Sequence, residues 1–181
     1  MLKMSRIVSL GVPVILFFCL TLAGCGYTTK STLPSRFKTI HIKSFKNKVE
    51  YQIKGDRNIY LPRMEVDVTN AIIKQFINDG YLKVVDAEDA DLVLSGELVD
   101  FERGGLRFAD NEDIEEYRLN VFVSMQLYDT QEAKNKWTED RFSGESTYFL
   151  TGPEAISEDQ AIENAIKDLG HRVVERTVDD W

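Results

Sequence analysis

Cys25 is the residue of this chain best placed for covalent chemistry. It directly follows Leu22-Ala23-Gly24, and the stretch from Ile7 to Leu22 is apolar and carries no charge. Lys3 and Arg6 form a short positive segment ahead of that stretch. This order is typical of a secretory signal peptide and not of a membrane span, because no stop-transfer charges follow the apolar run. We therefore expect cleavage directly before Cys25.

The residues around the expected cleavage site resemble the lipobox of bacterial lipoproteins. In that motif a peptidase cuts before a cysteine whose thiol carries diacylglycerol, which implies lipidation of Cys25. An ordinary signal peptide with an incidental Cys25 is the alternative. Cys19 lies in the segment to be removed, so the mature chain would hold one thiol and no intramolecular disulfide. Several acyl chains anchor a protein stably, and Gly26 at the second mature position implies the outer membrane.

No pattern for catalysis, metal binding or cofactor binding accompanies this cysteine. The only histidines, His41 and His171, are far apart in the sequence, and no Gly-rich phosphate loop or nucleophile elbow is present. The acidic stretch 110–116 could bind a hard cation, but it lacks the spacing and the central glycine of an EF-hand. A solvated loop is the favoured interpretation. We expect a protein that is not an enzyme and needs no cofactor.

The charge of the chain is unevenly distributed. The formal net charge is −8, and loss of Lys3 and Arg6 with the signal peptide would take it to −10. Between Lys30 and Arg63, however, the sequence contains nine Lys or Arg and only two acidic residues, a net charge of +7. The acidic remainder argues against nucleic-acid binding. The basic segment would lie close to anionic headgroups beside the anchor, or it simply solvates a strand and a loop.

The predicted organisation has three parts. Residues 1–24 are the signal peptide, residues 25–36 are a lipidated tether rich in Thr, Ser and Gly, and residues 37–181 form one domain. Alternation around Ile40 and Ile42 predicts a first strand over 37–45. A loop over 47–60 precedes a helix introduced by Leu61-Pro62 and capped by Gly80, and its apolar stripe is Val68, Ile72, Ile73, Phe76 and Ile77.

The second half of the chain predicts strands followed by a helix. Strand-like segments cover 82–85 and 91–101, and Arg103-Gly104-Gly105 indicates a turn. A clear alternation over 117–127 predicts a half-buried strand. Residues 137–150 are predicted to form a further strand, with a bulge or an edge near 141–144. Ser157 and Gln160 form a capping-box pattern ahead of a helix that ends near Thr177. The order β-α-β-β-β-α predicts an α+β fold, with two helices on one face of a mostly antiparallel four-stranded sheet.

Several short segments in this order resemble the LptE family of lipopolysaccharide-assembly lipoproteins. The resemblance covers nearly the whole mature chain, and it rests more on the order and spacing of the segments than on any one of them. The matching segments are Cys25-Gly26-Tyr27, Leu33-Pro34, Phe37-Lys38-Thr39-Ile40-His41-Ile42, Phe45-Lys46-Asn47, Gly80, Ala90-Asp91-Leu92-Val93-Leu94-Ser95-Gly96, Glu116-Tyr117-Arg118-Leu119 and Trp137.

The resemblance implies a non-enzymatic plug inside the outer-membrane β-barrel LptD that helps to assemble the barrel and to deliver lipopolysaccharide to the cell surface. In the family, contact with lipid A is attributed to basic residues in two loops. The first loop here offers Arg103 and Arg107, whereas 151–159 contains no Lys or Arg. We add Lys38 and Lys43 of the first strand as candidate lipopolysaccharide ligands, because they lie in the basic segment.

A second class of lipoprotein shares part of this pattern. The succession of strand, helix, Val84-Val85-Asp86 and the 90–96 segment also resembles the periplasmic modules of CsgG and LpoB lipoproteins. Those proteins act in secretion pores or activate peptidoglycan synthases. The long 117–150 hairpin and the length of a single domain favour the LptE resemblance.

Overall fold

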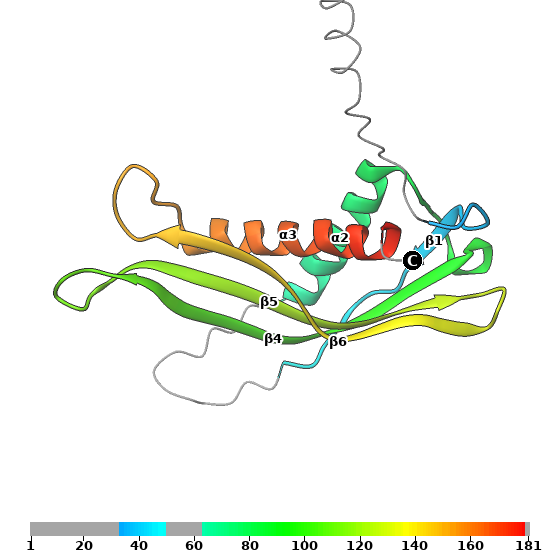
Figure 1. Ribbon diagram of the computed structural model, residues 1–181, viewed down its shortest axis with the longest axis horizontal. Helices are drawn as coiled ribbons and strands as arrows, with labels where there is room; N and C mark the ends of the chain where they lie inside the picture. The colour runs from blue at the N-terminus through cyan, green and yellow to red at the C-terminus, as the bar shows by residue number, and fades with distance from the viewer. Residues whose placement is uncertain (1–32, 50–62, 180–181) are drawn as a thin grey trace, which may run out of the picture. The chain divides into compact units, whose positions relative to one another are not determined.

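The computed structural model describes residues 33–49 and 63–179, and within them two long helices lie on one face of a single sheet (Figure 1). The helices are α2 (Met64–Asp79) and α3 (Glu158–Val178). This arrangement confirms the predicted α+β class. The signal peptide, Cys25, residues 25–32 of the tether, Leu61-Pro62 and Trp181 lie outside the described residues.

Three long consecutive strands form most of the sheet. They are β4 (Leu92–Phe108), β5 (Ile114–Asp129) and β6 (Lys134–Phe149), and β5 pairs antiparallel with both neighbours. From Leu119 to Asp129 every second residue of β5 is buried, as the alternation predicted. The buried face of β5 packs toward the helices through Leu119, Val121, Val123, Met125 and Leu127.

The predicted number of strands and their order are wrong. The sheet has six strands among the described residues, because β1 (Thr39–Ile42) is joined by β2 (Lys46–Asn47) and β3 (Lys83–Val84). These three strands pair in parallel, β1 between β3 and β4, and β2 with β4, so the sheet is mixed. The two residues of β2 place one side chain on each face and so leave no alternation to detect, whereas β3 lies within the segment predicted as strand-like at 82–85. A 3-10 helix, η1 (Ala87–Asp89), lies between β3 and β4.

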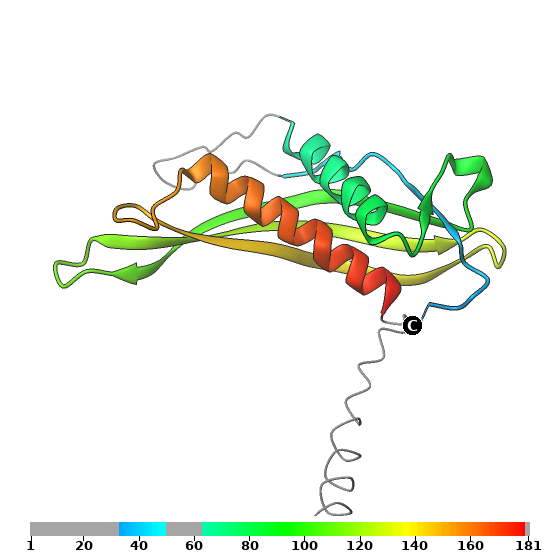
Figure 2. The same cartoon turned by 90° about the horizontal axis from the view of Figure 1, so that it is seen from above.

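The segment Arg103-Gly104-Gly105 is not the turn that its composition predicted. It lies within β4, where Gly104 pairs with Arg118 and Gly105 pairs with Tyr117. The turn comes later, at 109–113, where the N–H of Ala109 donates to the carbonyl of Asp113 at 2.8 Å. Register shifts on both sides of Arg107 accommodate the extra residues. The ribbon of β4 and β5 is therefore longer than predicted, and it projects beyond the helices (Figures 1 and 2).

The C-terminus of α2 and the N-terminus of α3 are those that the sequence predicted, whereas α2 begins at Met64 and the predicted start at Leu61-Pro62 lies outside the described residues. The C-cap of α2 is Gly80, whose φ of 78° lies in the left-handed region that glycine adopts freely and whose N–H donates to the carbonyl of Phe76. At the N-terminus of α3, the Ser157 side chain accepts a hydrogen bond from the N–H of Gln160. Val68, Ile72 and Phe76 of the predicted apolar stripe are fully buried and Ile73 is partly buried against the core, but Ile77 is 64% exposed, so the stripe is narrower than predicted.

Close contact between α3 and β6 depends on a glycine. A Cβ added at Gly144 would lie 2.5 Å from the carbonyl oxygen of Ala165 and from the Cα of Leu169. Only a residue without a side chain allows the helix backbone to approach the strand this closely. Figure 2 shows α3 lying along the sheet above β6.

The outer edge of β6 is capped by side chains from α3. Arg172 donates a hydrogen bond to the carbonyl of Ser143 at 2.8 Å, and Asp168 accepts one from the N–H of Glu145 at 2.9 Å. A register shift lies beside this point, between the partners of Val123 and Met125. The predicted irregularity of this strand is thus confirmed, since β6 is both an edge strand and bulged.

Candidate functional site

The four basic residues predicted as lipopolysaccharide ligands do not converge on one site. Lys38 and Lys43 flank β1, whose neighbour in the sheet is the first part of β4. Arg103 and Arg107 lie near the other end of β4. Lys43 donates its backbone N–H to Leu94, and thirteen residues of strand separate Leu94 from Arg107, which corresponds to roughly 40 Å. The predicted set therefore divides into two groups.

Arg103 is held by an internal ion pair. Its Nη1 lies 2.8 Å from both carboxylate oxygens of Glu158, in the first turn of α3, and its guanidinium lies 4.8 Å from the ring centroid of Tyr117. Partial burial by itself would lower the pKa of Arg103, but the carboxylate of Glu158 raises it above its ordinary value. Arg103 therefore fixes the start of α3 against the sheet. Its guanidinium is already neutralised by Glu158 and is poorly accessible to an external ligand.

Arg107 is more accessible. Its side chain is 60% exposed, its Nε lies 3.6 Å from Glu116, and its guanidinium lies 5.3 Å from the ring centroid of Phe149. A single long ion pair and one aromatic neighbour leave most of the guanidinium donors open to solvent. Of the two arginines predicted in this part of the chain, Arg107 is the one that could meet an external phosphate.

Lys43 borders a hollow on the face of the sheet opposite the helices. The hollow has a volume of about 420 Å³, and Lys46 lies on its rim as a second ammonium group. Its lining residues from the long strands alternate with the buried core residues, which places them on the open face. They are mostly hydroxyl, amide and carboxylate groups: Ser95, Glu97, Ser124, Gln126 and Thr138. The sequence indicated Lys43 through its charge, but the hollow itself had no sequence signal.

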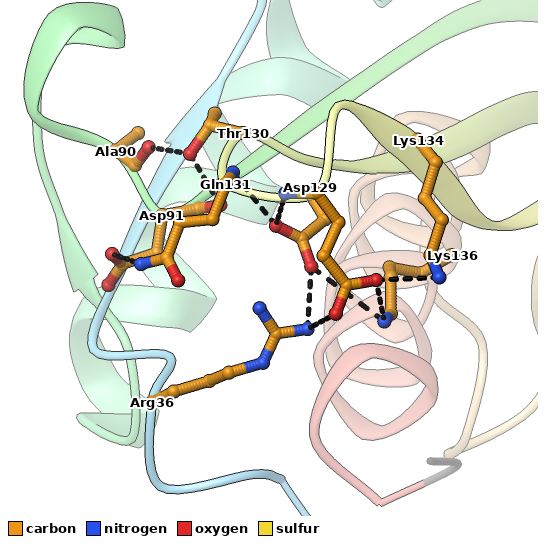
Figure 3. A network of polar contacts seen from close by, with 9 residues as sticks. Arg36, Ala90, Asp91, Asp129, Thr130, Gln131, Lys134 and Lys136 are labelled. Atoms are coloured by element: carbon orange, nitrogen blue, oxygen red, sulfur yellow. Dashed lines mark hydrogen bonds and ion pairs between the residues drawn. The ribbon is translucent and has the colours of Figure 1, made fainter.

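A cluster of ion pairs around Arg36 was not predicted. Arg36 donates to Asp129 at 2.7 Å and to Glu132 at 2.6 Å, across more than ninety residues of sequence (Figure 3). Lys136 lies 3.7 Å from Asp129, and Lys134 lies 2.6 Å from Glu132. Arg36 thereby fastens the residue at which the predicted tether meets the domain to the turn between β5 and β6. We call these five side chains the Arg36 cluster.

Asp129 is the buried centre of the Arg36 cluster. Its side chain has no exposed surface, because Arg36 and Lys136 cover it. One carboxylate oxygen accepts from the N–H groups of Gln131 and Glu132, and the other accepts from Arg36. Burial alone would raise the pKa of Asp129, but these hydrogen bonds and the guanidinium charge outweigh it and hold the pKa below its ordinary value.

Asp91 makes a second set of contacts beside this cluster. Its carboxylate accepts hydrogen bonds from the backbone N–H groups of Lys38 and Thr39 at 2.9 and 3.1 Å. Thr130 donates to the carbonyls of Ala90 and Asp91 (Figure 3). Hydrogen bonds thus join the beginnings of β1 and β4 and the turn after β5.

The described residues show no arrangement for metal chemistry. Across 33–49 and 63–179, no three His, Cys, Asp or Glu side chains come together as potential metal ligands. His41 contacts the carbonyl of Val85 in the sheet, whereas His171 contacts Gln75 between the helices, so the two histidines share no site. Neither α2 nor α3 is apolar enough over sufficient length to cross a bilayer.

A family model for lipopolysaccharide assembly, that of LptE, matches residues 37–180. The match spans the sheet and both helices. This chain belongs to the LptE family. LptE proteins are lipoproteins of the outer membrane that take part in lipopolysaccharide assembly, and the family is non-enzymatic. The resemblance inferred from short segments of the sequence is confirmed. A comparison with curated protein sequences finds no match.

Solved structures share the fold of this LptE family member at low sequence identity. A protein from Xanthomonas campestris superposes with a TM-score of 0.56 at 12% identity, covering 83% of this chain and 91% of its own. Lipoprotein B from Nitrosomonas europaea superposes with a TM-score of 0.52 at 14% identity, and the match covers 81% of this chain and 84% of that protein. A dodecameric PelC variant from Paraburkholderia phytofirmans superposes with a TM-score of 0.50 at 15% identity, and the match covers 83% of this chain and 96% of that protein. At these identities the likeness shows the fold alone.

Proposed function

We propose that this chain is an outer-membrane lipoprotein, anchored on the periplasmic side through acylated Cys25, that acts as a plug and assembly partner for an LptD-like β-barrel. In this role it assists the delivery of lipopolysaccharide to the cell surface and catalyses no reaction. The observation that carries the proposal is the family match over residues 37–180. The lipobox ahead of Cys25 supports the anchor, although that cysteine lies outside the described residues.

The open face of the sheet has the chemistry that a plug requires. A barrel lumen is lined by polar groups, so a domain that fills it must present polar groups that are already paired or can pair with the wall. On this face Gln126 donates to Ser95 at 3.3 Å and accepts from Asn135 at 3.0 Å. Lys48 lies 2.8 Å from Glu97. A rigid, hydrogen-bonded polar face of this kind suits contact with a lumen wall.

Direct contact with lipopolysaccharide is a further part of the proposal. Its phosphates would bind exposed cations, and the structure offers two separate groups of them. One group consists of Lys38 and Lys43, both exposed beside β1, and the other is Arg107. Arg103 is less suited to this role, because Glu158 already occupies its guanidinium.

Charge reversal distinguishes the two groups. The double variant Lys38→Glu, Lys43→Glu and the single variant Arg107→Glu are each expected to weaken capture of lipopolysaccharide, by at least about tenfold for the double variant. Capture is measured by pull-down of labelled lipopolysaccharide with the purified lipoprotein. The matched control reverses Lys74 and Lys167, two exposed lysines of the helices. Equal capture by both folded test variants and the control would refute direct binding through these cations.

Purification of the partner tests the main proposal. The full-length lipidated protein, extracted from outer membranes in detergent, is expected to bring down one large β-barrel in stoichiometric amount. Its N-terminal peptide should begin at Cys25 and carry the mass of attached acyl chains. Recovery of a peptidoglycan synthase or of a homo-oligomeric ring in place of the barrel would favour the CsgG or LpoB class and overturn the plug function.

A further inference from the structure

The projecting end of the β4–β5 ribbon exposes a group of large apolar side chains. Leu106 is 40% exposed, Phe108 is 58% exposed, and Leu150, which follows β6, is 49% exposed. The N–H of Leu150 donates to the carbonyl of Glu115, so it lies beside the same ribbon. Among the described residues these are three of the six exposed large hydrophobic side chains. We call this end, residues 106–115 with Phe149 and Leu150, the ribbon tip.

The side chains of the ribbon tip are held in defined positions. A Cβ added at Gly105 would lie 2.9 Å from the ring of Phe108 and 3.2 Å from Ile114, so the absence of a side chain at Gly105 lets both residues rest on the strand backbone. On the other face, the Arg107 guanidinium lies over the ring of Phe149. The tip is thus a structured apolar surface rather than a loose loop.

No helix covers the ribbon tip within the described chain. In both views the hairpin extends past the start of α3 and past the loop before it (Figures 1 and 2). Several large apolar side chains left outside the core at one end of a domain, and bordered by polar groups, are typical of an interaction site. The turn at the end of the ribbon supplies that polar border.

The charge of the turn decides between the possible occupants. Asp110, Glu112, Asp113 and Glu115 lie in or beside it, and Arg107 is the one Lys or Arg within residues 106–115, which leaves this stretch with a net charge of −4 + 1 = −3. Four carboxylates would be repelled by a bilayer surface of anionic lipid. They would equally repel a second copy docked tip to tip. Of the possible occupants, charge complementarity favours a partner protein whose surface carries cations around an apolar recess.

We propose that the ribbon tip docks into an apolar recess, bordered by Lys or Arg, on the β-barrel partner. This inference rests on the proposed function and assigns the part of the domain that recognises the barrel. The polar open face would line a lumen, whereas Phe108, Leu106 and Leu150 need apolar neighbours that a polar lumen wall does not supply. Docking energy in such interfaces is concentrated in a few buried aromatic and aliphatic anchors, and Phe108 is the most exposed candidate.

The test uses the full-length lipidated protein carrying Phe108→Ser and Leu150→Ser. Recovery of the barrel from detergent extracts is expected to fall at least about tenfold relative to the wild type. The matched control is Ile77→Ser with Tyr81→Ser, which removes two exposed apolar side chains, 64% and 47% exposed, at the end of α2. Circular dichroism confirms that both variants are folded. The control should recover the barrel as the wild type does.

A second variant tests the charge argument. Asp110→Lys with Glu112→Lys places cations opposite the predicted cationic border and should also reduce barrel recovery. Undiminished recovery by the folded apolar variant would overturn the docking site and leave the proposed function intact. Failure of the wild type to recover any barrel would overturn both.

The other occupants give different results. Flotation of the full chain carrying Cys25→Ser, which takes no acyl chain, but not of the same chain with the tip substitutions added, with phosphatidylglycerol vesicles would assign the tip to lipid and refute docking to protein. Self-association that is measured by sedimentation and lost in the tip variant would assign the tip to contact with a second copy. That result would also refute docking to the barrel. Neither is expected, because the acidic turn opposes both contacts.

Discussion

Replacing Gly144 with alanine is expected to lower the free energy of unfolding by about 3 kcal/mol, near the upper end of the range for overpacked sites. The added Cβ would lie 2.5 Å from the carbonyl oxygen of Ala165 and the Cα of Leu169. Both atoms belong to the α3 backbone, which cannot rotate away as a side chain could. The helix must therefore shift as a unit or leave the strand.

Thermal unfolding of the purified lipoprotein, followed by circular dichroism, measures this effect. A loss of this size corresponds to a fall in Tm of roughly 6–12 °C for a domain of this length. Gly104→Ala is the matched control, because Gly104 also lies in a strand but a Cβ there meets nothing within 4 Å. Its Tm should stay within a few degrees of the wild type. A similar Tm for all three proteins would show that α3 adjusts without cost.

The structure also shows which features a single sequence can predict. The helices followed from apolar residues at spacings of three and four, and their ends followed from Gly80 and from Ser157 with Gln160, because capping is a local interaction. The alternation in β5 was equally local. In contrast, β2 is two residues long and its presence depends on neighbours that are distant in sequence, whereas β3 lies within the segment predicted as strand-like at 82–85.

The error at Arg103-Gly104-Gly105 has a definite physical cause. Two glycines beside an arginine resemble a turn because glycine is frequent in turns. Here Gly105 instead makes room for Phe108 and Ile114 against the strand, and neither glycine has a positive φ. Glycine serves both purposes, and composition alone does not distinguish them.

The candidate site was predictable only in part for a similar reason. The basic segment identified Lys38 and Lys43, and the family resemblance identified Arg103 and Arg107, but neither reveals which cations already have partners. Glu158 lies 55 residues from Arg103 and occupies its guanidinium. Long-range pairs of this kind leave no periodic pattern in one sequence.

Replacing Asp129 with asparagine is expected to lower the free energy of unfolding by about 2 kcal/mol at pH 7, the scale of a hydrogen bond to a charged group. The amide oxygen can still accept from the N–H groups of Gln131 and Glu132, which preserves the turn. The amide NH2, however, would face the guanidinium of Arg36 in place of a carboxylate oxygen. The substitution thus removes the ion pairs with Arg36 and Lys136 while it keeps the local backbone contacts.

The effect of this substitution should depend on pH in one direction. Because the pKa of Asp129 is lower in the folded state, its ionised form stabilises the fold above the unfolded pKa of about 3.9. That contribution is lost as pH falls through the folded pKa. The Tm difference between wild type and Asp129→Asn should therefore be greatest at pH 6–7 and shrink below about pH 4. Comparison with the variant cancels the titration of Asp91, whose pKa is also lowered but which does not contact Arg36.

Asp140→Asn is the matched control for this experiment, because Asp140 is an exposed carboxylate in β6. Its Tm should follow the wild type at every pH. A difference between wild type and Asp129→Asn that stays constant or grows at low pH would contradict an ionised Asp129 at the centre of the Arg36 cluster. If the cluster holds the tether at the turn between β5 and β6, Asp129→Asn should also increase protease cleavage near Arg36 at pH 7, whereas the control should not.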